Sequence, residues 1–307
     1  MSTVSVSILI TNFNYARFLV EAINSALEQT YSGSKVQVVV VDDGSTDQSC
    51  DVIKRYTGRI TPVFKDNGGE ASAVNAGFEA CEGDIVCMLD ADDYFFPEKV
   101  EEVVKAFHER PSAGWHFHTL PKVMDGCSNA EQGSIVWSNR KLTDYRLRVR
   151  GGESMPLLPA TSGLSFRRDV LKAILPMPVT FRTCADAFLR LAAISDAPGL
   201  LSPQELAVHR IHGNNLFEGR NNADVVAMHV DIWLSDAIQQ CRPFTKPFTD
   251  RLFAHAIGRL AAYKGWRYTL SLPEVSSYLQ SLSSPKAKLR CANRAIFNWV
   301  RCYLQHL

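Results

Sequence analysis

Short apolar runs alternate with longer segments of helical periodicity through the first 110 residues. The apolar runs cover residues 4–10, 36–41, 60–64 and 85–89 and are typical of strands buried on both faces. Segments 16–29, 45–56, 70–81 and 97–110 carry apolar residues at helical spacing. Ser45 with Gln48 matches a capping box, and Pro97 suits a first helical turn. The alternation predicts an α/β sheet with parallel, right-handed crossovers.

Beyond residue 110 this alternation weakens and then gives way to helices. Strands are predicted over 115–123, 161–167 and 199–211, a polar surface loop over 125–150, and a helix over 183–193. His116 and His118 share one face of the first of these strands and are interpreted as packing residues, because no third metal ligand lies nearby. From residue 223 onward only helical patterns occur, over 223–240, 247–268, 273–282 and 286–307. We therefore expect a domain over 1–215 and a helical C-terminal extension over 216–307.

Composition narrows the class of protein only slightly. The 307 residues are 46% hydrophobic and 21% charged, which is ordinary for a chain with a substantial core. A net charge of +1 argues against nucleic acid as an obligatory partner. The eight cysteines include no CxxC pair, so neither a zinc site nor a disulfide framework is indicated. No basic and apolar leader and no bilayer-long apolar run is evident, so a cytoplasmic location is expected.

Three carboxylates follow the apolar run at 85–89 within four residues, at Asp90, Asp92 and Asp93. Charges are costly in a core, so they are expected to emerge, accessible, at the C-terminal end of the strand. Ligands bind at that end of an open α/β sheet, and carboxylate oxygens suit Mg²⁺ or Mn²⁺. A solvated acidic turn is the alternative, and the triplet alone does not decide between them. The patterns GxGxxG and GxxxxGK[ST] are missing, which disfavours a dinucleotide enzyme and a P-loop NTPase.

Four segments resemble, in their order and spacing, the family 2 glycosyltransferases of the GT-A fold. They are Ser7-Ile-Leu-Ile-Thr-Asn-Phe-Asn14, Val41-Asp-Asp-Gly-Ser45, Asn67-Gly-Gly-Glu-Ala-Ser-Ala-Val-Asn-Ala-Gly77 and Asp90-Ala-Asp-Asp93. The resemblance is strong over residues 4–110, fair over 155–215 and absent from the C-terminal helices. It implies a single nucleotide-binding, Rossmann-like mixed sheet flanked by helices. Residues 1–110 would bind the nucleotide sugar and residues 111–215 the acceptor.

The resemblance also implies roles for individual residues. Donor binding would fall to Thr11, Phe13, Asn14, Asp43, Asn67, Ser72, Asn75, Asp90 and Ala91. Within that set Asp43 would hold the base and Asp90 the ribose. Asp92 would coordinate Mn²⁺ or Mg²⁺, and His212 is either a further metal ligand or a structural loop histidine. Asp186 would be the general base, although Ala185 stands where many relatives have a second acid, and Val74 where arginine is frequent.

The predicted function is inverting, metal-dependent transfer of a hexosyl or N-acetylhexosaminyl group from a nucleotide sugar, with UDP favoured. The acceptor would be a hydroxyl of a saccharide, a lipid-linked compound or a protein, as in polysaccharide biosynthesis, and loops 125–155 and 177–184 would select it. An acceptor hydroxyl needs a base, and a departing diphosphate needs a cation. A non-catalytic nucleotide-sugar-binding subunit is the alternative. A nucleotidyltransferase is disfavoured because residues 11–15 contain no glycine or lysine.

The last predicted helix, over 286–307, interleaves basic and apolar residues. A basic amphipathic helix of this kind would lie on an anionic membrane, which would make the protein peripheral at the inner face. Packing of its apolar side against its own domain is the alternative. Homo-oligomerisation is left open.

Overall fold

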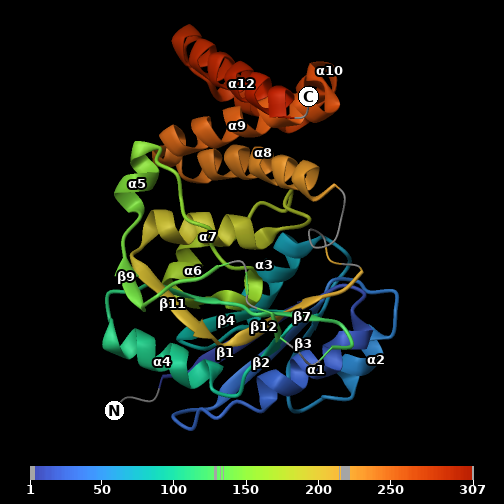
Figure 1. Ribbon diagram of the computed structural model, residues 1–307. Coiled ribbons are helices and arrows are strands. Elements are labelled where there is room, and N and C mark those ends of the chain that lie inside the picture. The colour runs from blue at the N-terminus through green and yellow to red at the C-terminus, as the bar shows by residue number, and fades with distance from the viewer. Residues whose placement is uncertain are drawn as a thin grey trace. The chain divides into compact units, whose positions relative to one another are not determined.

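Eight strands form the central sheet, in the order β3-β2-β1-β4-β10-β6-β11-β9 (Figure 1). Their bounds are β1 Val6–Asn12, β2 Val36–Asp42, β3 Thr61–Phe64, β4 Ile85–Asp90, β6 Trp115–Thr119, β9 Lys141–Thr143, β10 Leu164–Arg167 and β11 Gly199–Glu205. Strands β3, β2, β1 and β4 run parallel to one another, whereas β10 runs antiparallel to β4 and β6. The prediction of a mixed sheet is confirmed.

This computed structural model describes residues 4–127, 130–131, 133, 135–213, 215 and 222–305. The chain divides into two units, one formed by residues 1–145 and 156–212 and the other by residues 146–155 and 213–307. The predicted start of the helical extension, residue 216, lies outside the described residues. The division of the chain at that point stays a prediction.

Helices cover both faces of the central sheet (Figure 1). Those on one face are α1 Ala16–Leu27, α2 Ser49–Lys54 and α4 Lys99–Glu109, and those on the other are α3 Glu70–Ala80, α6 Arg168–Ile174 and α7 Ala185–Asp196. Ile8 and Ile10 of β1 point into the first layer. On the other face α3 lies so close to the sheet that a Cβ at Gly77 would be 2.3 Å from a methyl of Leu9. The strands are apolar on both sides because both sides are covered.

Three predicted elements differ from the structure, each for a local reason. The capping box does not form, and α2 begins at Ser49, because the Ser45 hydroxyl instead accepts the Asn14 backbone N–H at 2.8 Å. Helix α4 begins at Lys99, two residues after Pro97. The strand over 115–123 is two strands, because Pro121 lacks the N–H that a continuous ladder needs. The second of them, β7 Lys122–Met124, belongs to a four-stranded sheet with β5 Tyr94–Phe95, β12 Ala207–Ile211 and β8 Ala130–Glu131.

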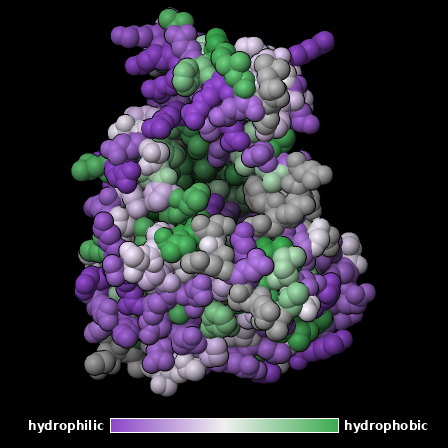
Figure 2. Space-filling model, in the orientation of Figure 1, coloured by the Kyte–Doolittle hydropathy of each residue, from purple (hydrophilic) through white to green (hydrophobic). Residues whose placement is uncertain are grey.

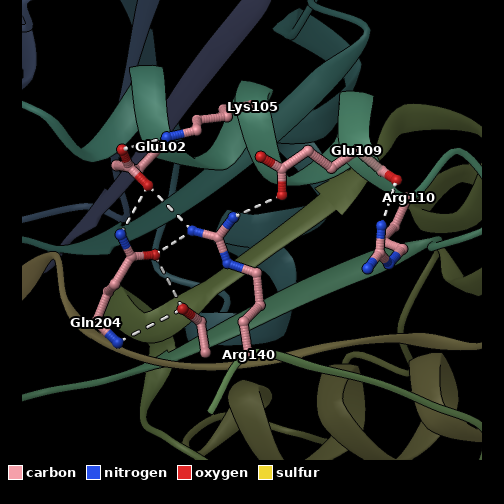
Figure 3. Close-up of polar contacts among 7 residues, drawn as sticks. Glu102, Lys105, Glu109, Arg110, Arg140 and Gln204 are labelled. Atoms are coloured by element: carbon pink, nitrogen blue, oxygen red, sulfur yellow. Dashed lines mark hydrogen bonds and ion pairs between the residues drawn. The ribbon is translucent and has the colours of Figure 1, made fainter.

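The polar segment over 125–150 contains β8, β9 and the short helix α5 Arg146–Gly151 rather than being loop throughout. Arg140 fixes part of it to α4 (Figure 3): its guanidinium lies 3.0 Å from the Glu102 carboxylate and 3.3 Å from that of Glu109. Gln204 contacts Arg140 and donates to the same Glu102 carboxylate at 2.7 Å. These hydrogen bonds, that of Gln204 first, lower the pKa of Glu102. The part of the segment around Arg140 is therefore attached to α4 and to Gln204 of β11 by a half-buried polar network.

His116 and His118 lie in the core together with Lys99, and all three are fully buried. His118 Nε2 contacts the Lys99 amine, and its Nδ1 lies 2.8 Å from the Thr119 carbonyl. Burial lowers the pKa of Lys99 to about 8 and holds the pKa of both histidines well below the usual value. Neutral imidazoles are therefore part of this core.

Helices make up the second unit. They are α5, α8 Ala223–Cys241, α9 Lys246–Lys264, α10 Trp266–Ser271, α11 Pro273–Ser281 and α12 Pro285–Gln305. The helix predicted over 247–268 is interrupted at Gly265, whose φ of 83° ends α9. Phe253 and Tyr278 stack in the centre of the unit, with ring centroids 4.0 Å apart. Of the helices described, none combines the length and the apolar character that crossing a bilayer requires.

Gly199→Ala is expected to lower the free energy of unfolding by about 1–3 kcal/mol, the usual cost of overpacking. A Cβ at this position would lie 2.0 Å from the buried Trp115 ring. Gly151→Ala is the control, because its Cβ would meet no atom closer than 3.9 Å. Urea unfolding of both variants measures the difference. An unchanged midpoint for Gly199→Ala would contradict this packing.

Candidate functional site

The C-terminal ends of three neighbouring strands lie side by side in the central sheet. The register pairs Asn12 of β1 with Asp42 of β2, and Thr11 of β1 with Asp90 of β4. Because parallel strands end at the same edge, the turns that follow them share one rim. The structure therefore brings the donor-binding candidates of the first, second and fourth motifs to one edge of the sheet.

Asp43 follows β2, and its carboxylate is buried among hydrogen-bond donors. One oxygen accepts the Gly68 N–H at 3.0 Å and lies 2.5 Å from Lys65 Nζ. The other accepts the Gly69 N–H at 2.7 Å and the side-chain amide of Asn67 at 3.2 Å. Two donors on each oxygen occupy the usual acceptor positions of a carboxylate. Asp43 thus fastens loop 65–69 to the end of β2.

Asn14 and Phe13 form the turn after β1. Asn14 has φ 62°, in the left-handed region that asparagine tolerates better than most residues. Its side-chain oxygen accepts the Thr46 N–H at 2.7 Å, which joins this turn to the one after β2. The Phe13 ring is 44% exposed and so is free to contact a ligand.

The acidic turn after β4 places carboxylate oxygens of Asp90, Asp92 and Asp93 within 4.8 Å of one another. The expectation that they are freely accessible is wrong for Asp92 and Asp93, which are 9% and 1% exposed. Asp93 is engaged by the protein, since the Ser162 hydroxyl donates to it at 2.6 Å and the Arg210 N–H at 2.8 Å. Burial, followed by repulsion from Asp92 and Asp93, raises the pKa of Asp90 well above its usual value.

This set of oxygens fits a hard divalent cation. Within the part of the chain that the structure describes, it is the one group of three or more acidic, histidine or cysteine ligands close enough to share an ion. The Asp90 carboxylate accepts no hydrogen bond from the described residues, so no protein donor offsets its charge. A cation beside Asp90 and Asp92 would remove the repulsion that burial intensifies.

His212 meets the same turn from the end of β12. Its Nε2 lies 2.9 Å from Asp92 Oδ2, and its ring packs 4.8 Å from that of Phe18 and 5.6 Å from that of Tyr15. The structure thus brings together the two residues predicted as metal ligands. The ring packing is also what a structural histidine would show, so both interpretations of His212 stay open.

Asp186 lies in the first turn of α7, where Arg190 pairs with it at 3.2 Å. The carboxylate of Glu70, at the start of α3, faces the backbone N–H groups of Cys184 and Ala185, which act to lower its pKa. Burial, and after it the nearby Asp186 carboxylate, raises the pKa of Glu70 to about 7. A second acid therefore stands beside the predicted base, contributed by a different helix.

Two loops are joined by hydrogen bonds beside Glu70. The Glu70 N–H donates to the Arg182 carbonyl at 3.0 Å, and the Ala71 N–H to the Phe181 carbonyl at 3.1 Å. Gly69 permits this approach, because it has φ 87° and a Cβ there would lie 2.6 Å from Arg182 Cα. Arg182 in turn donates to the Asn67 side chain at 2.5 Å. Loop 65–69 and the segment preceding α7 are thus one connected structure.

The remaining candidates have other surroundings. Both side-chain amide atoms of Asn75 bond the Met177 backbone, at 2.8 and 2.9 Å, so Asn75 holds the loop at 177–184 rather than reaching the carboxylates. Ser72 is half-buried in the first turn of α3. Ala91 is 1% exposed and offers little more than its backbone to a ligand.

Glu70, Lys65 and Arg182 were missed by the sequence analysis, although all three contact predicted site residues. An acid in the first turn of a helix is common because it suits the helix dipole, so Glu70 gave no distinct signal. Arg190 could have been found, because its i,i+4 spacing from Asp186 predicts an ion pair on a helix.

Comparison with known proteins agrees with this geometry. The family model described as Glycosyl transferase family 2 matches residues 7–174. An uncharacterized glycosyltransferase of Nostoc sp. is 36% identical over 215 residues, which are 68% of this chain and 66% of that protein. Two Rickettsia proteins match over 34% of this chain and 32% of their own length. The chain thus matches only part of the length of these relatives.

Two solved structures show the fold. Residues 1–349 of Staphylococcus aureus TarS, in complex with UDP-GlcNAc, give a TM-score of 0.66 at 16% identity, with 98% of this chain and 91% of that chain covered. A mannosyltransferase of Pyrobaculum calidifontis, in complex with GDP-Man and Mn²⁺, gives 0.53 at 17% identity, with 98% and 82% covered. The predicted GT-A fold is confirmed.

Glu70→Gln is expected to stabilise the metal-free protein more at pH 8 than at pH 5. The pKa of Glu70 is raised from 4.5 to about 7 in the folded state, so the folded state binds this proton more tightly than the unfolded chain. Stability is therefore lost as the pH rises from 4.5 through 7, and glutamine abolishes that loss. Thermal unfolding in EDTA at both pH values measures it.

Glu79→Gln is the matched control, because Glu79 is exposed on the same helix. It should change the unfolding temperature equally at both pH values. The same behaviour from Glu70→Gln would contradict the buried environment assigned to Glu70.

Proposed function

The chain belongs to glycosyltransferase family 2, and on that basis we propose that it transfers a sugar from a nucleotide-sugar donor to an acceptor hydroxyl. The proposal is supported chiefly by the positions of the carboxylate side chains. Asp43 and the Asp90–Asp93 turn share one rim of the sheet, while Asp186 approaches from α7. Donor binding and acceptor activation need carboxylates at separate positions, and this arrangement supplies them.

The donor would bind along the rim formed by the turns after β1 and β2. Asp43 would hold the base, Asp90 the ribose, and Thr11, Phe13 and Asn14 the walls of the pocket. Because the Asp43 oxygens already accept four donors, a base N–H would have to displace one. The side chains of Lys65 and Asn67 can move, whereas the backbone N–H groups of Gly68 and Gly69 are fixed by the loop. UDP is favoured, and TarS in complex with UDP-GlcNAc supports that preference.

Asp92 would hold Mn²⁺ or Mg²⁺ close to Asp90, with His212 either as a further ligand or as the partner that orients Asp92. When bound, such a cation would offset the negative charge that builds on the departing diphosphate. The neighbour that contains Mn²⁺ supports this assignment. Ser162 and the Arg210 N–H keep Asp93 in place as an anchor of the turn.

Asp186 would act as the general base on the acceptor. Its carboxylate would take the hydroxyl proton while that oxygen attacks the anomeric carbon and the bond to the diphosphate breaks. A single displacement of this kind inverts the anomeric configuration. Glu70 would be a positioning residue, because its carboxylate faces the backbone N–H groups at the start of α7, immediately before Asp186. The loop at 177–184, held by Asn75, would shape the acceptor side, whether the acceptor is a saccharide, lipid-linked or a protein.

Asp92→Asn is expected to weaken Mn²⁺ binding at least about tenfold, because it removes one charged ligand while it preserves size. Titration calorimetry with MnCl₂, and then with UDP in the presence of Mn²⁺, measures the loss. Asp51→Asn is the control, because Asp51 is exposed on α2. Asp92 is buried against His212, so the unfolding temperature must be checked. Unchanged Mn²⁺ affinity in a folded variant would exclude Asp92 as a ligand.

Asp186→Asn is expected to lower sugar transfer by roughly 10²–10⁴-fold, the range for a general base, while UDP binding survives. Asparagine keeps the shape of the side chain but cannot accept the proton. A panel of nucleotide sugars, screened for metal-dependent hydrolysis, first identifies the donor for the assay. Asp196→Asn, at the other end of α7, is the control. A rate near that of the wild type would show that the base lies elsewhere.

A further inference from the structure

Helix α12 points its large apolar side chains away from the other helices of the second unit. Leu289, Ile296, Phe297, Val300, Tyr303 and Leu304 are between 41% and 67% exposed. The side chains that it buries are the small ones of Cys291, Ala295 and Cys302. Close packing on α9 explains this choice, since a Cβ at Gly258 would lie 2.3 Å from the Ala295 carbonyl. The apolar side of the helix is therefore only partly covered by its own unit.

The exposed residues form one stripe. With 3.6 residues per turn, positions 289, 296, 300 and 303 fall on one side of a helix, and positions 291, 295 and 302 fall about half a turn away. The larger aromatic side chains extend the surface: the Trp299 and Tyr303 rings stack with centroids 5.8 Å apart, and Trp266 of α10 lies 6.4 Å from Trp299. A contiguous apolar surface of this kind commonly marks an interaction site.

The charge on α12 has a single sign. Lys286, Lys288, Arg290, Arg294 and Arg301 are basic, and residues 285–305 contain no acid. All five are exposed, and Lys286, Arg290, Arg294 and Arg301 fall along one edge of the apolar stripe by helical spacing. Figure 2 shows hydrophobic and hydrophilic atoms next to one another where Figure 1 draws α12. The whole chain carries only +1, so this helix is a local concentration of positive charge.

We propose that α12 binds an anionic lipid surface, with its apolar stripe among the acyl chains and its basic residues at the headgroups. Amphipathic helices with a basic polar face and aromatic or leucine side chains opposite have this property. A second copy of the chain is a poorer occupant, because pairing two α12 helices would bring five positive charges against five others. Bilayers that contain anionic lipid offer the complementary charge. Such binding would place the protein where a lipid-linked acceptor is found.

Flotation of the full chain with vesicles tests the proposal. Binding is expected with phosphatidylcholine vesicles that contain phosphatidylglycerol, and it should fall at high salt because ions screen the headgroups. Vesicles of phosphatidylcholine alone should bind far less. Arg290→Gln combined with Arg294→Gln and Arg301→Gln should weaken binding about 100-fold, at about fivefold for each charge near the surface. Phe297→Ser combined with Leu304→Ser should weaken it at least about tenfold.

Matched controls come from the other unit. Lys54→Gln with Arg55→Gln removes exposed charge from α2, and Phe64→Ser removes an aromatic ring that is 47% exposed on β3. These variants should bind vesicles like the wild type, and all variants should unfold at the wild-type temperature. Wild-type binding by both α12 variants overturns the proposal. The proposal is also overturned if the wild type does not bind vesicles but sediments as a dimer, and the double variant Phe297→Ser with Leu304→Ser sediments as a monomer.

Discussion

Repulsion among buried carboxylates is the constraint on which the candidate site depends. Asp90 lies within the electrostatic influence of Asp92, Asp93, Glu70 and Asp186, and burial adds the largest cost of charging it. Ionised groups are retained at such density only where donors or cations compensate them. The Asp93 carboxylate accepts hydrogen bonds from the Ser162 hydroxyl and the Arg210 N–H. His212 lies against Asp92, and Arg190 pairs with Asp186. Asp90 is left without a hydrogen-bond donor among the described residues, and that imbalance favours a divalent cation at this turn.

A second feature is the connection between the Asp43 and Asp186 sides of the site. The N–H groups of Glu70 and Ala71 donate to the carbonyls of Arg182 and Phe181. The Glu70 carboxylate also faces the backbone N–H groups at the start of α7. Only a glycine at position 69 allows the chains to approach so closely. Movement of the loop that contacts Asp43 would therefore displace the first turn of α7, where Asp186 lies. In the proposed mechanism, this contact would relate donor binding mechanically to placement of the base.

In the second unit, some helices bury their large apolar side chains and one helix leaves them exposed. Helices α8, α9 and α11 bury large side chains in a shared core, whereas α12 is held by small residues and leaves its large ones outside. Full burial of a side chain of this size contributes roughly 1.5–3 kcal/mol relative to full exposure. Because these side chains are between 41% and 67% exposed, covering them would contribute about half of that. The exposed apolar stripe lies beside five basic residues. Binding to another surface, such as the proposed anionic lipid, explains this arrangement better than folding of the unit alone.

The sequence by itself determined the alternation of strand and helix, the acidic turn after β4 and the family, because these depend on short-range periodicity and on motifs that keep fixed spacing. Tertiary structure alone decided which distant groups meet. Ser45 caps no helix because Asn14 takes its hydroxyl, His212 reaches Asp92 across 120 residues, and Glu70 reaches α7. The pattern of α12 was also visible in the sequence, but a helical period specifies an apolar side without saying what lies against it. The small residues of α12 determine which side of the helix faces α9, because close packing there admits no larger side chain.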